Sequence, residues 1–176
     1  MELEGHIALV TGGGQGIGKA ISLTLAKYGA DMILFELNSE KAEEVSKDIY
    51  SLGRKALSVK VDVSKTEEVE DGFRKAIESF GRIDILVNNA GITKDALIVR
   101  MKDEDWDKVI EVNLKGAFLC TRSAVKTMSK QRYGRIINIS SVVAFMGNTG
   151  QVNYVASKSG IVGLTKTVAK EYAARG

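Results

Sequence analysis

Short aliphatic runs alternate along the chain with longer segments in which apolar side chains recur every three or four positions. The short runs predict strands and the periodic segments predict helices. The predicted strands are 6–10, 32–36, 55–61, 84–91 and 135–140. The predicted helices are 16–29, 39–53 and 64–81, with two more before the last strand. This alternation predicts an α/β fold, a doubly wound Rossmann-type parallel sheet with helices on both faces.

The hydrophobic pattern also predicts which faces are buried. The second and third helices each carry an apolar face, formed by Ala42, Val45, Ile49 and Leu52 and by Val69, Phe73, Ile77 and Phe80. Most strands are almost continuously apolar, as buried parallel strands are, whereas 55–61 alternates and suits an edge. Glycines just past the last periodic residues predict helix ends at Gly29, Gly53 and Gly81. Since no linker or repeat divides the 176 residues, we expect one Rossmann domain over 1–176.

Composition excludes several classes of protein. Hydrophobic residues at 44% and charged residues at 27% are typical of globular proteins, and no apolar run approaches the roughly 20 residues that span a bilayer. The first residues are acidic and do not resemble a signal peptide, so we expect a cytoplasmic protein without membrane contact. The net charge of +3 comes without a Lys/Arg cluster, which argues against nucleic-acid binding. One cysteine, Cys120, and one histidine, His6, argue against a metal site.

A glycine-rich turn, TGGGQGIG at 11–18, joins the first predicted strand to the first predicted helix. Its glycines allow a tight turn and a close backbone approach to a pyrophosphate, and the helix N-terminus supplies N–H groups for the anion. In this position the turn predicts a dinucleotide site. At the end of the second strand, Glu36 could accept hydrogen bonds from the adenosine ribose, or it could be a solvated strand-end acid. Its charge would repel a 2′-phosphate, so NAD(H) is favoured, while NADP(H) stays open because Lys41 could offset that charge.

A tyrosine and a lysine stand four residues apart in YVASK at 154–158. On a helix the two side chains lie one turn apart on one face, and the ammonium of Lys158 could stabilise a phenolate at Tyr154. Taken alone, such a pair is more often structural than catalytic, so the other motifs must decide.

Six segments in order resemble the short-chain dehydrogenase/reductases. They are TGGGQGIG at 11–18, VDV at 61–63, NNAG at 88–91, Asn113 in VIEVNLKGAF, ISS at 139–141 and YVASK at 154–158. The stretches 88–118 and 140–160 are most similar to the 3-oxoacyl-[acyl-carrier-protein] reductases of fatty-acid synthesis. The resemblance implies an enzyme that reduces a 3-oxoacyl thioester, linked to acyl carrier protein or CoA, by hydride transfer from a nicotinamide cofactor.

The resemblance also implies a role for each site residue. Tyr154 would protonate the substrate carbonyl oxygen, and Lys158 would lower the pKa of that phenol from its usual value of about 10 and hold the nicotinamide ribose. Ser141 would hydrogen-bond the same oxygen, and Asn113 would hold a water that links Lys158 to solvent. The cofactor contacts would be Gly12, Gln15, Gly16, Ile17 and Gly18 at the pyrophosphate, and Asp62 and Val63 at the adenine. Asn88, Ala90 and Gly91 would line the adenosine ribose and support the central sheet. Asn89 would instead tie strands together through Thr11.

The sequence departs from the family pattern in two places. Gln15 and Glu36 stand where many NADPH-using reductases carry basic or neutral residues, so an NADH-dependent variant stays open. Family members also continue well beyond the helix that carries Tyr154. We therefore expect a fragment, truncated after that helix and lacking the segment that shapes the substrate pocket.

The resemblance further implies partners. Arg132 and Arg175 match basic positions that such reductases present to an acidic carrier protein, although both could be plain helix-end charges. We expect a homo-oligomer, a tetramer, formed through the helices at about 113–132 and 153–175. Two other functions stay open: an NAD-dependent alcohol or polyol dehydrogenase of the same superfamily, which Glu36 supports, and a non-catalytic nucleotide-binding protein.

Overall fold

Apolar strands organise residues 2–176, the part of the chain that the computed structural model describes, into a five-stranded sheet. The strands are β1 (Ile7–Thr11), β2 (Asp31–Glu36), β3 (Ala56–Lys60), β4 (Ile85–Asn88) and β5 (Arg135–Asn138). Their order is β3-β2-β1-β4-β5, and every pairing is parallel. The predicted doubly wound fold is confirmed, with 55–61 forming the predicted edge. The strand order reverses between β1 and β4, which is where open α/β sheets bind ligands.

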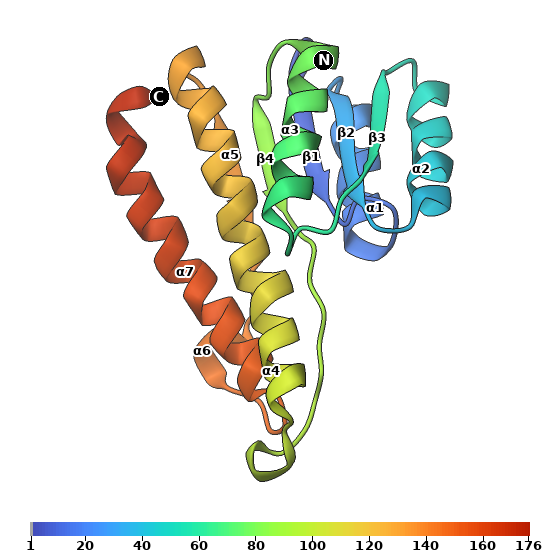
Figure 1. Cartoon of the computed structure of the whole chain (residues 1–176). Coiled ribbons are helices and arrows are strands. Elements are labelled where there is room, and N and C mark those ends of the chain that lie inside the picture. The colour runs from blue at the N-terminus through green and yellow to red at the C-terminus, as the bar shows by residue number, and fades with distance from the viewer. Residues whose placement is uncertain (1) are drawn as a thin grey trace.

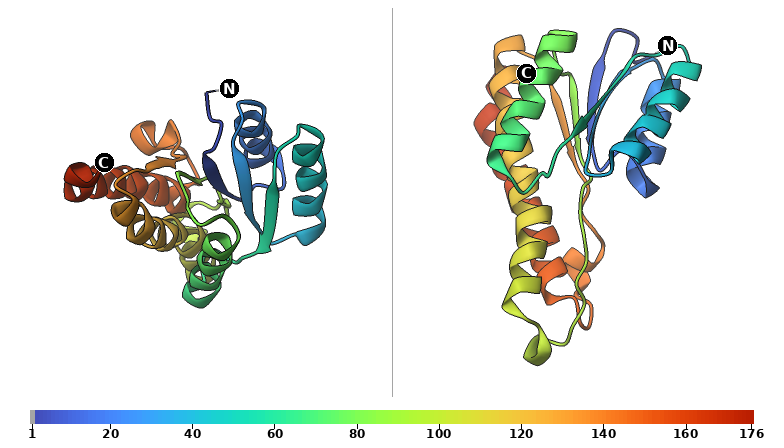
Figure 2. Two further views of the ribbon diagram at one scale, coloured as in Figure 1. Left: turned by 90° about the horizontal axis from the view of Figure 1, so that it is seen from above. Right: turned by 45° about the vertical axis from the view of Figure 1, so that its right-hand side comes forward.

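Helices cover both faces of this sheet (Figure 1, Figure 2). One face carries α1 (Gly16–Lys27) and α2 (Ser39–Ser51), and the other carries α3 (Thr66–Phe80), α5 (Gly116–Gln131) and α7 (Val152–Tyr172). The remaining elements are η1 (Ile98–Arg100), α4 (Asp103–Val109), the π-helical segment η2 (Ile110–Lys115), α6 (Val143–Met146) and η3 (Ala173–Arg175). The helix expected to begin near Asn113 thus begins at Asp103, because α4, η2 and α5 follow one another without a break.

Alternate residues of β1, β2 and β4 fill two separate hydrophobic cores. Leu9, Ile33 and Phe35 pack with α3 and α5, whereas Val10 and Leu34 pack with α1 and α2. Successive side chains of a strand point to opposite faces, so an almost continuously apolar strand serves both layers. This two-sided burial holds the carboxyl ends of β1, β2 and β4 at one rigid edge.

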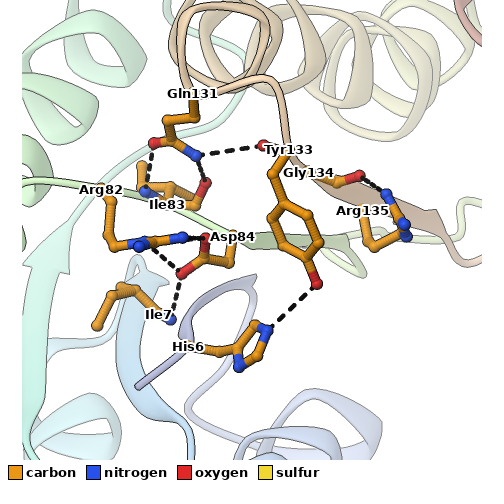
Figure 3. A network of polar contacts seen from close by, with 9 residues as sticks. All are labelled: His6, Ile7, Arg82, Ile83, Asp84, Gln131, Tyr133, Gly134 and Arg135. Atoms are coloured by element: carbon orange, nitrogen blue, oxygen red, sulfur yellow. Dashed lines mark hydrogen bonds and ion pairs between the residues drawn. The ribbon is translucent and has the colours of Figure 1, made fainter. Parts of the chain in front are cut away.

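A polar network ties the strands together at their amino ends (Figure 3). The fully buried Asp84 accepts a hydrogen bond of 2.9 Å from the backbone N–H of Ile7 and pairs with the Arg82 guanidinium at 2.6 Å. Nearby, His6 Nε2 lies 3.2 Å from the hydroxyl of Tyr133. These contacts join β1, β4 and the start of β5, so this end of the sheet is occupied by structural contacts and the opposite end is left for a site.

Candidate functional site

A cleft of about 540 Å³ opens at the carboxyl ends of the strands, beside the point where the strand order reverses. The glycine-rich turn, the ends of β2 and β3, the loop after β4 and the start of α7 form its walls. The predicted site residues that line it are Gly12, Gln15, Ile17, Gly18, Glu36, Asp62, Val63, Ala90, Gly91, Tyr154 and Lys158. Residues separated by more than 140 positions in the sequence therefore meet in one cleft.

The glycine-rich turn brings bare backbone to the cleft. Gly12 has a positive φ of 63°, and its N–H donates a 2.7 Å hydrogen bond to the Phe35 carbonyl. A Cβ at Gly18 would overlap the carbonyl oxygen of Gly12, so a side chain cannot be accommodated there. The Gln15 side chain does not cap α1 and accepts instead from the Lys41 ammonium. The N–H groups at the start of α1 thus stay available to an anion.

Glu36 presents a fixed carboxylate at the end of β2. The residue is 7% exposed, and its Oε2 accepts a 3.0 Å hydrogen bond from the Gly14 N–H. Its Oε1 accepts from the N–H groups of Leu37 at 3.0 Å and Asn38 at 3.2 Å. A Cβ on Gly14 would come within 2.9 Å of Glu36 Cγ, so a glycine is needed for this approach. The alternative of a solvated strand-end acid is wrong, because three backbone donors hold the carboxylate at the cleft wall.

Asp62 carries a second carboxylate into the cleft. Its Oδ1 accepts hydrogen bonds from the Ser64 N–H at 2.9 Å and the Ser64 hydroxyl at 2.7 Å. Burial works to raise the pKa of Asp62, but the Ser64 hydrogen bonds and the charges of Lys108 and Lys65 outweigh it and hold the pKa below its usual value. Asp62 is therefore an ionised acceptor at neutral pH.

Tyr154 and Lys158 both face the cleft from α7, as their spacing predicts. Lys158 is 4% exposed, and its Nζ donates a 2.7 Å hydrogen bond to the Ile139 carbonyl and lies 5.6 Å from the centroid of the Tyr154 ring. Burial lowers the pKa of Lys158 because the charged form is the one that desolvation disfavours. Within residues 2–176 no hydrogen bond joins the Tyr154 hydroxyl to Lys158 or Ser141, and the ammonium donates to the Ile139 carbonyl instead.

Four predicted site residues are not among those that line the cleft: Gly16, Ser141, Asn88 and Asn113. Gly16 is the first residue of α1. Ser141 is in the loop after β5, where its hydroxyl accepts a 3.4 Å hydrogen bond from the Val143 N–H. Asn88 does not reach the adenosine side as predicted, because its amide points under α5 and donates to Thr121 at 3.0 Å and Asn138 at 2.8 Å. The bond to Asn138 joins β4 to β5. Asn113 is the fourth of these residues.

Asn113 is buried behind the cleft in the π-helical segment η2. Its Oδ1 accepts a 2.8 Å hydrogen bond from the Ile92 N–H, and its Nδ2 donates to the Ile92 carbonyl at 3.0 Å and to the Ser157 hydroxyl at 3.1 Å. A Cβ on Gly91 would lie 3.3 Å from Asn113 Oδ1 and 3.6 Å from Lys158 Nζ, so these two groups approach the same point. π-Helical turns occur often at functional sites.

Other contributors were missed by the sequence analysis. Lys108 and Val112 line the cleft from the continuous helix, four positions apart and therefore on one helical face. Asn89 behaves as predicted: its N–H donates to the Thr11 hydroxyl at 3.0 Å, and its amide donates to the Thr11 carbonyl at 3.0 Å. Ser157, whose hydroxyl accepts from Asn113, was also missed. Its position inside the YVASK motif is the sequence signal that could have identified it.

Metal-binding and membrane-spanning features are absent from the described part of the chain. Between residues 2 and 176 there is no group of three His, Cys, Asp or Glu side chains that could hold a metal ion. No helix in that range is long and apolar enough to cross a bilayer. Cys120 is fully buried, and burial raises the pKa of its thiol to about 12, so it is an unreactive core residue.

Comparison with known proteins gives a consistent result. Residues 6–176 match a family model described as short chain dehydrogenase. The chain is 49% identical to the 3-oxoacyl-[acyl-carrier-protein] reductase of Thermotoga maritima over 175 residues, covering 99% of this chain and 71% of that protein. It is 50% identical to the 3-oxoacyl-[acyl-carrier-protein] reductase of Synechocystis sp. over 175 residues, with coverage of 99% and 71%.

Two solved structures share this architecture closely. A putative short-chain alcohol dehydrogenase from Sinorhizobium meliloti 1021 superposes with a TM-score of 0.96 at 37% identity, covering 99% of this chain and 69% of that one. A xylitol dehydrogenase with bound NAD+ superposes with a TM-score of 0.98 at 33% identity, covering 100% and 68%.

Proposed function

Because this chain belongs to the short-chain dehydrogenase family, we propose that it reduces 3-oxoacyl thioesters to 3-hydroxyacyl thioesters in fatty-acid synthesis. The observation that carries the proposal is the single cleft in which the glycine-rich turn meets Tyr154 and Lys158. The similarity to two 3-oxoacyl-[acyl-carrier-protein] reductases supports the substrate class.

The cleft fits a nicotinamide dinucleotide, which would supply the hydride when bound. The side-chain-free turn and the N-terminus of α1 suit its pyrophosphate, and Asp62 and Val63 suit its adenine end. Glu36 suits the hydroxyls of the adenosine ribose and disfavours a 2′-phosphate. Moving its carboxylate aside would leave the N–H groups of Gly14, Leu37 and Asn38 without a partner, so we propose NAD(H) as the preferred form.

Residues on and near α7 would transfer the proton that the substrate carbonyl oxygen receives. Tyr154 Oη would donate its proton to the substrate carbonyl oxygen, and the nearby Lys158 ammonium would stabilise the resulting phenolate. The Ser141 hydroxyl accepts from Val143, which leaves its own proton free to hydrogen-bond the same carbonyl oxygen. Asn113 would order a water that returns a proton towards Lys158 from solvent.

The first test is turnover of acetoacetyl-CoA, followed by oxidation of NADH and NADPH in parallel. Tyr154→Phe should lower kcat by about 100-fold or more, because the general acid is lost while the ring remains. Tyr28→Phe is the matched control, since Tyr28 is 52% exposed and lies outside the cleft. Retained turnover in Tyr154→Phe would refute the assigned role. Tight NADH binding without any thioester turnover would refute the substrate.

A second candidate function is oxidation of an alcohol or polyol with NAD. The buried Glu36 carboxylate favours it, and so does the close structural similarity to the NAD+-bound xylitol dehydrogenase. Xylitol-dependent reduction of NAD by this protein, without turnover of acetoacetyl-CoA, would select this candidate.

Arg132 and Arg175 are proposed to bind an acidic carrier protein. Arg132 ends α5 with a φ of 55°, Arg175 lies in η3, and the two helix ends are side by side (Figure 1). They lie at the amino ends of the strands, roughly 30 Å from Tyr154 along α7 at about 1.5 Å per residue. A carrier bound here would reach the cleft through an arm of that length or enter the cleft of a neighbouring copy. Replacing both arginines by alanine should raise KM for carrier-linked substrate more than for the CoA thioester, and equal effects would refute docking.

We propose a homo-oligomer, a tetramer, formed through the outer faces of α5 and α7. Phe118 supports this assignment because its large apolar ring is 43% exposed on α5. The cytoplasmic location stays a prediction.

A further inference from the structure

Ser157 is a fully buried polar residue between Tyr154 and Lys158 on α7. Its hydroxyl donates a 2.7 Å hydrogen bond to the Tyr154 carbonyl and accepts a 3.1 Å hydrogen bond from Asn113 Nδ2. One hydroxyl group thus connects the backbone of the proposed acid to the side chain of the proposed proton-relay residue.

The connection extends to the loop after β4. Asn113 forms hydrogen bonds with both the N–H and the carbonyl of Ile92, which lines the cleft. A chain of hydrogen bonds therefore runs from α7 through η2 to the cleft wall. The two elements also pack tightly, because a Cβ on Gly160 of α7 would lie 2.7 Å from a side-chain methyl carbon of Leu114 in η2. A loosened Asn113 side chain would therefore disturb three elements at once.

Serines elsewhere in the helices give the ordinary comparison. Ser22, Ser46 and Ser51 each donate to the carbonyl four residues earlier, at 2.9, 2.9 and 3.0 Å, which is the usual behaviour of a helical serine. Ser157 donates instead to the carbonyl three residues earlier, and it accepts from a side chain of the proposed site. The Ser157 hydroxyl therefore bonds to Asn113 as well as to its own helix.

We propose that Ser157 is a positioning residue for the reduction, which holds the Asn113 carboxamide in register with Tyr154 and Lys158. The inference rests on the proposed function, in which those three residues move the proton. Without the hydroxyl, Asn113 Nδ2 keeps only the Ile92 carbonyl, and the carboxamide can turn away from the point it shares with Lys158 Nζ. Such a residue can matter for the rate, because a misplacement of reacting groups by about 1 Å can cost about 100-fold.

The test compares Ser157→Ala, Ser157→Thr, Asn113→Ala and the Ser157→Ala, Asn113→Ala double variant in acetoacetyl-CoA reduction. Ser157→Ala should lower kcat about 10-fold or more and leave the cofactor Kd within about twofold, because it acts on positioning and not on binding. Ser157→Thr keeps the hydroxyl and should recover most of the loss. The double variant should be no slower than Asn113→Ala, because Ser157 acts through Asn113.

The control is Ser46→Ala, which also removes a buried hydroxyl with an intrahelical bond and a bond to a second element, Ser58 at 2.7 Å. It should lower Tm about as much as Ser157→Ala and leave kcat unchanged. If Ser157→Ala behaves like this control, or if its effect adds fully to that of Asn113→Ala, the inference is overturned.

Hydrogen exchange separates the inference from the proposed function. The Ile92 N–H donates to Asn113 Oδ1, so its exchange should be faster in Ser157→Ala than in the wild type, whether or not the protein turns over a thioester. An unchanged Ile92 exchange rate overturns the positioning role. Failure of Tyr154→Phe to reduce turnover, with faster Ile92 exchange, would instead refute the proposed chemistry.

Discussion

At the scale of single residues, two buried charges dominate the cleft, and they are satisfied differently. The Glu36 carboxylate has three backbone donors, whereas the Lys158 ammonium donates to one carbonyl and forms no salt bridge within residues 2–176. A buried ammonium with so few partners costs stability. Lys158 therefore lowers the free energy of unfolding, as expected of a residue whose role is in the site.

Lys158→Met should stabilise the cofactor-free protein near pH 7 by roughly 0.5–2 kcal/mol while abolishing turnover. Burial lowers the pKa of Lys158, so the unfolded chain binds more protons between that lowered pKa and the ordinary value of 10.5. Wild-type stability should thus rise with pH through this window, and the advantage of the variant should shrink. Urea unfolding near pH 7 and near pH 10 measures this difference.

Lys166→Met is the matched control on the exposed part of α7 and should change stability by less than about 0.5 kcal/mol. A Lys158→Met variant that is less stable than the wild type near pH 7 would show that the hydrogen bond to Ile139 outweighs the cost of burial.

Glu36→Gln should shift the ratio of kcat/KM values for NADPH and NADH towards NADPH by about tenfold, which corresponds to ~1.4 kcal/mol. The substitution removes the charge that repels a 2′-phosphate and keeps the shape and one acceptor for the N–H groups. Steady-state kinetics with both cofactors measures the ratio, and Glu40→Gln, an exposed charge in the first turn of α2, is the control. An unchanged ratio would show that Glu36 does not discriminate between the adenosine riboses of NADH and NADPH.

At the scale of elements, the site depends on how closely α7 packs on η2. The approach is possible because Gly160 faces Leu114, and the hydrogen bonds of Asn113 and Ser157 cross the same contact. Gly163 lies about one turn further along the helix, where an added Cβ would meet no atom within 4 Å. The same helix therefore provides a crowded glycine and an open one.

Gly163→Ala should raise the free energy of unfolding by about 0.4–1 kcal/mol, because alanine has the better helix propensity and meets no neighbour. Gly160→Ala should lower it, since the new Cβ would lie 2.7 and 3.0 Å from the two Leu114 methyl carbons. Gly160→Ala should also lower kcat by displacing η2. Thermal unfolding with parallel kinetics decides the point, and a Gly160→Ala variant as stable as Gly163→Ala would contradict the close packing.

At the scale of the whole molecule, the two edges of the sheet differ. Within residues 2–176, β3 and β5 each pair with one neighbour. On β5, Ile137 is 46% exposed, and an apolar cavity of about 250 Å³ lies between this strand, α5 and α7. An unpaired strand beside apolar surface favours association with another chain.

Ile137→Lys should therefore reduce concentration-dependent association of the 176-residue chain, because a charge on an edge strand opposes edge-to-edge pairing. Sedimentation velocity over a range of concentrations measures the effect. Val99→Lys is the control, since Val99 is 86% exposed and lies away from this edge, in η1. Equal association of the wild type and Ile137→Lys would show that β5 is not a contact surface.

The amino-acid sequence by itself determined the sheet, the helix faces and the cleft position. Strand runs, helical periods and helix-ending glycines such as Gly81 are local signals, and a glycine turn after the first strand leaves few places for a dinucleotide. Tyr154 and Lys158 were placed on one face because a helical period relates them directly.

Tertiary structure alone decided the contacts between segments distant in the chain. Three such contacts are the backbone donors around the Glu36 carboxylate, the hydrogen bond of the Asn88 amide to Thr121 of α5, and the hydrogen bond between Ser157 and Asn113. They depend on how the elements pack, and no local period in the sequence predicts them. The π-helical segment η2 is of the same kind, because a helical pattern does not distinguish it from an α-helix. Residue types and their spacing determined which groups the site contains, and packing determined which of them touch.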